Sequence, residues 1–187
     1  LRAYQEAYNS TTDQHQQSAA LLGIARTYYG ASDCSNATQA VSVIIDHFPE
    51  SPEAAVAFYI KGQCAQLDGE YILAAESFQR YIDLRPGTLT AFMNTLKGDA
   101  YLAANDTMRA MEAYLIVQEN TEPANLPAIK IKIARTYTAM GDTTNALRTY
   151  QGQSDVFVIN DQGTITAMTF GGGANALVTE LLGETGT

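Results

Sequence analysis

The stretch AVAFYIKGQCAQLDGEYILAAESFQRYIDLRP, residues 55–86, predicts one helix, a turn and a second helix. Apolar residues recur every three or four positions on both sides of the turn at Gly69, which is the spacing of a helix face. Pro86 ends the second helix, because proline cannot continue the hydrogen-bond ladder. Gly62 and Ala74 are small, so we expect them at the crossing, where they let bulky neighbours interdigitate.

The same spacing recurs along the chain, which predicts a repeat architecture. A small residue is followed by another small residue 12 positions later and by a bulky apolar one four positions after that. Successive units begin 37, 36 and 36 residues apart. The sets are Ala25, Ala37 and Val41; Gly62, Ala74 and Phe78; Gly98, Ala110 and Tyr114; Ala134, Ala146 and Tyr150.

These units resemble the tetratricopeptide repeat (TPR), whose signature pairs W-x2-L-G-x2-Y with A-x3-F and a closing proline. The second unit matches it at Phe58, Gly62, Ala74, Phe78 and Pro86. The chain departs from the signature in having no tryptophan, and Lys61 and Lys97 stand where the family has leucine. The resemblance covers about residues 1–151.

The resemblance implies an all-α fold, a right-handed superhelical array of antiparallel helix pairs. We expect repeats at about 14–50, 51–86, 87–123 and 124–152, preceded by a partial repeat at 1–10. The array would form a helical domain over residues 1–152. Helices outside the quoted stretch are expected near 14–29, 36–48, 89–104, 107–119, 127–140 and 143–151.

Residues 153–187 differ in composition and predict an appended or truncated segment. VFVINDQGTITAMTF, from Val156, alternates and is rich in Val, Ile, Thr and Phe, which predicts a β-hairpin turning at 161–163. Three glycines at 171–173 are interpreted as a flexible joint, since the Lys and Ser/Thr of a phosphate-binding loop are missing. A short amphipathic helix is expected at 177–182.

Composition disfavours several classes of function. The chain of 187 residues has a formal net charge of -9 with only 11 scattered basic residues, so nucleic acid is not an expected partner. It contains no apolar run of 18 residues, so no membrane span is predicted. The chain opens at Leu1 without methionine or a signal-like core, so we expect that its ends were set by processing or by excision.

The sequence offers no catalytic, cofactor or metal motif. His15 and His47 are the only imidazoles, and neither has a Ser, Cys or carboxylate at a spacing that suggests a relay. Cys34 and Cys64 form no CxxC motif, and we interpret them as two free thiols, with a disulfide left open. A non-enzymatic protein without a cofactor is therefore predicted.

The TPR resemblance implies a groove lined by the first helix of each repeat, where a peptide or protein partner binds. A subgroup of the family binds C-terminal carboxylates through Lys and Asn, but Gln63 and Asp99 stand here, so acidic chaperone tails are not expected. Contact with the next repeat is an equally weighted alternative for these positions. The predicted groove residues are Leu22, Arg26, Tyr29, Tyr59, Gln63, Gln66, Thr95, Asp99, Leu102, Ile131, Arg135 and Thr138.

We therefore predict a protein–protein interaction scaffold or adaptor. Two alternatives remain: a helical regulatory segment of a larger envelope enzyme, such as a lytic transglycosylase, or a self-assembly module acting through residues 153–187. The joint HFPESPEAA, residues 47–55, resembles that of bacterial envelope-associated members of the family, which suggests the periplasm or cell envelope.

Overall fold

A computed structural model describes residues 1–120, 125–151, 156–159 and 165–169. The chain divides into two compact units, Leu1–Glu122 and Pro123–Thr187, which are described separately. In the described ranges, no helix is long and apolar enough to cross a membrane.

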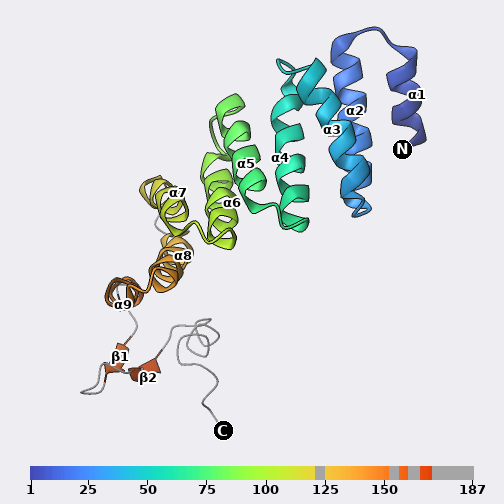
Figure 1. Ribbon diagram of the computed structural model, residues 1–187. Coiled ribbons are helices and arrows are strands. Elements are labelled where there is room, and N and C mark those ends of the chain that lie inside the picture. Colours follow the sequence, from blue (N-terminus) through green and yellow to red (C-terminus); the bar gives the residue numbers. More distant parts are fainter. Residues whose placement is uncertain (121–124, 152–155, 160–164, 170–187) are drawn as a thin grey trace. The chain divides into compact units, whose positions relative to one another are not determined.

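The first unit is a succession of helices, each packed against the next (Figure 1). In addition, α2 packs directly against α4, so the first helices of the first two repeats are in contact. The helices predicted from the repeat spacing are present, which confirms the all-helical interpretation of this part. They are α1 (Arg2–Ser10), α2 (Gln14–Gly30), α3 (Cys34–His47), α4 (Pro52–Leu67), α5 (Tyr71–Leu84), α6 (Thr90–Ala103) and α7 (Thr107–Glu119).

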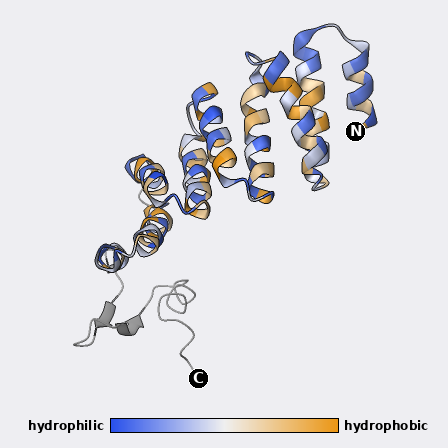
Figure 2. Cartoon of the chain, in the orientation of Figure 1, coloured by the Kyte–Doolittle hydropathy of each residue, from blue (hydrophilic) through white to orange (hydrophobic). Residues whose placement is uncertain are grey.

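The small residues of the repeats lie at the helix crossings, as the spacing predicts. Ala25, Ala37 and Ala74 are 0% exposed. A Cβ on Gly62 would meet the ring of Phe78, and one on Gly98 would meet Tyr114. Phe78 belongs to a core that continues from the second repeat into the third, and another core joins the first two repeats. Each helix of the unit carries both hydrophobic and hydrophilic residues (Figure 2).

The turn inside each repeat has the same backbone geometry every time. One residue in it has a positive φ, of 60° at Ser32, 79° at Gly69, 59° at Asn105 and 77° at Gly141. The N–H of the following residue bonds a carbonyl five positions back, as in the Schellman ending of a helix. The backbone conformation of the turn therefore recurs with the same period as the sequence pattern.

Aspartates at these turns begin the next helix in three of the four repeats. The carboxylates of Asp33, Asp106 and Asp142 accept the backbone N–H three residues on, at 3.1 Å in each case. Such caps satisfy a donor that the first helical turn leaves without a partner. Hydrogen bonds from Asn36, Arg109 and Asn145 lower the pKa of these three carboxyls respectively.

Lys97, which departs from the TPR signature, is accommodated by a polar contact. It is half-buried on α6, and its Nζ donates a 2.7 Å hydrogen bond to Oε1 of Gln79 on α5. Burial lowers the pKa of the Lys97 ammonium, while the charges of Asp83 and Glu112 oppose that shift. A charged residue thus fits where the signature has leucine.

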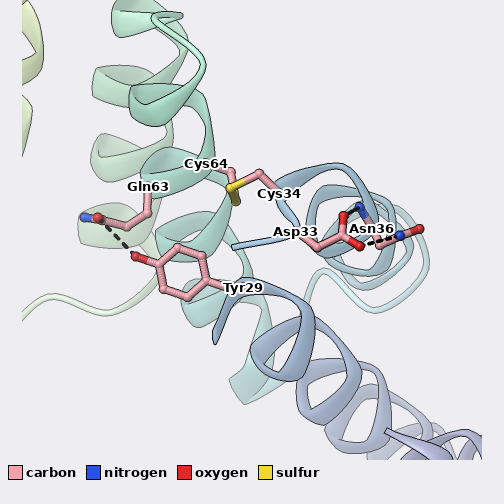
Figure 3. The surroundings of a disulfide bond; sticks show 6 residues. All are labelled: Tyr29, Asp33, Cys34, Asn36, Gln63 and Cys64. Carbon is pink, nitrogen blue, oxygen red and sulfur yellow. Dashed lines mark hydrogen bonds between the residues drawn. A yellow bond between two sulfur atoms is a disulfide. The ribbon is translucent and has the colours of Figure 1, made fainter. Parts of the chain in front are cut away.

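The two cysteines are joined by a disulfide, so the prediction of two free thiols is wrong (Figure 3). Cys34 is the first residue of α3, and Cys64 lies in the last turn of α4. Because these two helices pack against each other in opposite directions, the start of one meets the end of the other. Their Cα atoms are 5.3 Å apart, within the range that a disulfide spans.

The second unit contains α8 (Leu126–Ala139) and α9 (Thr143–Gln151), which pack together as a helix pair. Two strands, β1 (Val156–Ile159) and β2 (Ile165–Thr169), pair antiparallel, with Val156 opposite Thr169. The expected turn at 161–163, the glycines at 171–173 and the helix at 177–182 lie outside the described residues.

Candidate partner-binding site

The predicted groove residues fall on the first helix of each repeat. In the first unit these helices present what we call the first-helix face, formed by α2, α4 and α6; the other three residues belong to α8 in the second unit. The positions are Leu22, Arg26 and Tyr29 on α2; Tyr59, Gln63 and Gln66 on α4; Thr95, Asp99 and Leu102 on α6; Ile131, Arg135 and Thr138 on α8.

These residues differ in how much surface they offer. Leu22 is only 7% exposed and belongs to the core between the first two repeats, because α2 packs against α4 at this point. Arg26 is exposed, whereas Tyr59, Gln63 and Asp99 are half-buried. Leu22 therefore contributes packing and little contact surface.

Tyr29 and Gln63 connect two neighbouring repeats. The hydroxyl of Tyr29 donates to Oε1 of Gln63 across 3.4 Å (Figure 3). Burial raises the pKa of the nearby Tyr59 phenol, and the charge that Tyr29 would carry adds to this. Tyr29 and Gln63 thus contact the neighbouring repeat, which is the alternative to partner binding that the sequence left open for these positions.

Asp99 and Thr95 on α6 are engaged within their own repeat. Oδ1 of Asp99 accepts a 2.6 Å hydrogen bond from the hydroxyl of Tyr114 on α7. The hydroxyl of Thr95 donates to the carbonyl of Ala91 one turn earlier, at 2.9 Å. Asp99 therefore joins α6 to α7, whereas the hydroxyl of Thr95 is engaged within its own helix.

A pocket of about 570 Å³ opens on the first-helix face, and we call it the α2–α4–α6 pocket. It brings together two predicted groove residues, Arg26 and Tyr59, from different repeats. Its wall is completed by the end of α5, the loop after it and the start of α6. The lining residues are Arg26, Val56, Tyr59, Tyr81, Arg85, Pro86, Gly87, Thr88, Leu89, Phe92 and Met93.

Sequence reasoning missed Arg85, Leu89 and Phe92. They lie outside the positions predicted to line the groove: Arg85 and Leu89 belong to the loop after α5, and Phe92 lies in the first turn of α6. The sequence shows only that two large apolar residues, Leu89 and Phe92, follow the Pro-Gly turn; the structure adds that they stay 48% and 50% exposed. Exposed apolar residues that gather in one place are typical of binding surfaces.

The pocket is basic although the chain is acidic. Arg26 and Arg85 line it, and no Asp or Glu is among the lining residues. Within the part of the chain that the structure describes, neither arginine forms an ion pair, whereas Arg2, Arg80 and Arg109 each pair with a carboxylate on their own element or at its cap. Two guanidinium groups are therefore available to an anionic ligand at this site.

One cluster in the first unit has the residue types of a hydrolase triad but not its geometry. Ser18 is buried, and its Oγ donates a 2.9 Å hydrogen bond to Oε2 of Glu53, while Nδ1 of His15 lies 3.9 Å from the same oxygen. In a triad the imidazole stands between hydroxyl and carboxylate and takes the hydroxyl proton. Here the serine bonds the carboxylate directly, so the cluster joins α2 to α4 and does not activate a nucleophile.

No group of three or more His, Cys, Asp and Glu side chains suited to a metal ion occurs among residues 1–120 and 125–151.

Comparison with known proteins places the fold among TPR-like repeats. A crystal structure of MamA has a TM-score of 0.66 at 21% identity, covering 80% of this chain and 82% of that one. A kinesin light chain from Podospora anserina with nearly identical TPR-like repeats has a TM-score of 0.66 at 18% identity, covering 80% of each chain. BtubC (BKLC) from P. vanneervenii has a TM-score of 0.56 at 18% identity, covering 91% of this chain and 79% of that one.

These likenesses confirm the TPR-like fold that the repeat spacing predicts. No family model matches the sequence, and no curated protein matches it.

Proposed function

We propose that the chain is a protein-interaction scaffold whose first-helix face holds a segment of a partner polypeptide. A TPR-like array exposes a long side-chain surface on a rigid backbone and needs no reactive centre for this purpose. The α2–α4–α6 pocket is the observation that carries the proposal, because it is a hollow on this face lined by residues from three repeats and by the loop after α5.

The chemistry of the pocket suits a peptide. Tyr59 and the half-exposed ring of Phe92 offer aromatic surface, and Arg26 adds a charged donor beside them. Tyrosine and arginine are enriched among the residues that dominate the energy of protein interfaces. A polypeptide segment matches such a mixture better than a small polar metabolite does.

The Cys34–Cys64 disulfide supports an oxidising location for this scaffold. Disulfides persist in secreted, periplasmic or cell-surface proteins and are rare in reducing compartments. We therefore propose that the protein works outside the cytoplasm. The bacterial periplasm or cell envelope, suggested by the joint at residues 47–55, is one such location.

A displayed random-peptide library tests the proposal. Peptides selected on the whole chain are expected to lose binding when Tyr59→Ala and Phe92→Ala are combined. The matched control combines Leu67→Ala and Met108→Ala, which remove side chains that are 70% and 67% exposed and do not line the pocket. Selected peptides that bind the pocket variant as well as the natural chain would show that this face is not the binding surface.

A further inference from the structure

The α2–α4–α6 pocket is positively charged, whereas the chain as a whole is negatively charged. The chain carries 20 acidic against 11 basic residues, yet the pocket has two arginines and no carboxylate on its wall. Outside the pocket, Arg80 and Arg109 are each held by a neighbouring aspartate and also lie over an aromatic ring, Phe58 and Tyr101 respectively. The arginines of the pocket have no comparable engagement in the described chain.

We propose that this pocket recognises an acidic side chain of the partner together with an apolar side chain beside it. The inference rests on the proposed function and specifies its ligand. A carboxylate between Arg26 and Arg85 would accept charge-assisted hydrogen bonds from guanidinium groups, whose planar donors match its two oxygens. Arg26 comes from α2 and Arg85 from the cap position directly after α5, so the site exists only in the folded array.

The pocket residues other than the two arginines indicate which side chain should lie beside the acidic one. Leu89 and Phe92 are about half exposed, and Pro86 and Tyr59 continue the same surface. Covering this area removes apolar surface from water, which favours an apolar residue next to the acidic one. The expected determinant is therefore Asp or Glu adjacent to a large apolar side chain.

A polyanion is a poorer match than such a peptide. Nucleic acid affinity comes from many cations that release counterions along a phosphate chain, whereas this pocket offers two arginines on a chain of net charge -9. The missing Lys and Asn of a C-terminal carboxylate clamp do not count against an internal acidic residue. Gln63 and Asp99, which replace that clamp, do not line the pocket.

Synthetic copies of the library peptides provide the test, measured by fluorescence anisotropy. Each peptide is made in its acidic form, with its Asp and Glu changed to Asn and Gln, and with its C-terminus amidated. We expect the acidic form to bind roughly tenfold more tightly than the amide-substituted one, and the difference to shrink as salt is raised. Amidation of the terminus should change nothing.

Variants assign this preference to the pocket. The double variant Arg26→Gln and Arg85→Gln should bind the acidic and amide-substituted peptides equally, with the weaker affinity of the latter. Arg2→Gln is the control for loss of positive charge as such, because it removes an exposed arginine side chain that lies on α1 and does not line the pocket. It should keep the full preference, and circular dichroism should show the same helicity in all variants.

Equal binding of acidic and amide-substituted peptides, or a preference that survives in the double arginine variant, would overturn the inference and leave the proposed function standing. A preference that vanishes on C-terminal amidation would also overturn it, since the bound carboxylate would then be a chain end. A library that yields no binder, or binders indifferent to Tyr59→Ala with Phe92→Ala, would overturn both proposals.

Discussion

The ring of Phe78 on α5 lies against the backbone of Gly62 on α4, so close that a Cβ added to Gly62 would lie 2.6 Å from Phe78 Cε1. The next repeat has the same arrangement, since a Cβ on Gly98 would lie 2.5 Å from Cε1 of Tyr114. Real Cβ atoms do not approach other carbon atoms this closely. Each glycine therefore provides the space that the aromatic ring of the following helix occupies.

Gly62→Leu should destabilise the chain by about 1 to 3 kcal/mol, because the side chain must displace the buried ring of Phe78. Urea unfolding followed by circular dichroism measures the loss. Gly30→Ala is the control: it also adds a Cβ to a helical glycine, but nothing lies within 4 Å of that position. It should be neutral or stabilising by up to about 1 kcal/mol.

A double-mutant cycle shows whether the ring is the cause. When Phe78→Ala is already present, Gly62→Leu should cost clearly less than it does alone, because the side chain then enters the space that the ring left. Strictly additive effects would mean that the helix crossing is not where the glycine matters.

The repeats could be predicted from the sequence because each has a small residue at the same position, where its two helices cross and a bulky side chain needs room. The turns illustrate the limit of this reasoning. Gly69 and Gly141 indicate a positive φ, but Ser32 and Asn105 adopt it too, because the turn of the repeat imposes the geometry on whichever residue occupies the position.

The candidate site was only partly predictable. Arg26 and Tyr59 follow from repeat positions, whereas Arg85 and Leu89 reach the pocket through the path of a loop, which has no period, and Phe92 follows that loop in the first turn of α6. Leu22 has a groove position by the repeat count, yet it is buried in the core where α2 packs against α4. The spacing of residues in the sequence determines which helix face a residue lies on. How exposed that residue is depends on how closely the adjacent repeats pack.

Breaking the Cys34–Cys64 disulfide should lower stability by roughly 3 to 4 kcal/mol, since the bridge closes a loop with a sequence separation of 30. Thermal melts with and without a thiol reductant give the shift of the midpoint. The double variant Cys34→Ser with Cys64→Ser should melt near the reduced natural chain and should not respond to reductant. Equal midpoints for the oxidised and reduced natural chain would show that the helices are held in place without the bridge.

Tyr114→Phe should destabilise by about 1 to 2 kcal/mol, because Asp99 loses the 2.6 Å hydrogen bond from the tyrosine hydroxyl while the buried ring is retained. Chemical unfolding measures the difference. Adding Asp99→Asn to Tyr114→Phe should cost less than Asp99→Asn does alone, and independence of the two changes would contradict the assigned contact. Substitutions at Asp99 therefore affect the fold before they report on any partner.

The three capping aspartates, Asp33, Asp106 and Asp142, should make stability fall in acid. Hydrogen bonds hold the folded-state pKa of each carboxyl below its ordinary value of 3.8: chiefly from the side chains of Asn36 and Arg109 at Asp33 and Asp106, and from the backbone N–H of Asn145 at Asp142. A carboxyl whose pKa is lower in the folded state contributes its full stabilisation above the unfolded pKa. That contribution disappears as the pH falls from about 4 through the folded values.

Replacing all three by asparagine isolates this effect, because asparagine also caps helices but does not titrate. The urea midpoint of the natural chain should drop more between pH 6 and pH 3 than that of the triple variant. Glu119→Gln with Glu76→Gln serves as the control, since these exposed glutamates cap no helix, and it should keep the natural slope. If the triple variant lost as much stability in acid as the natural chain, the caps would not be the groups that titrate.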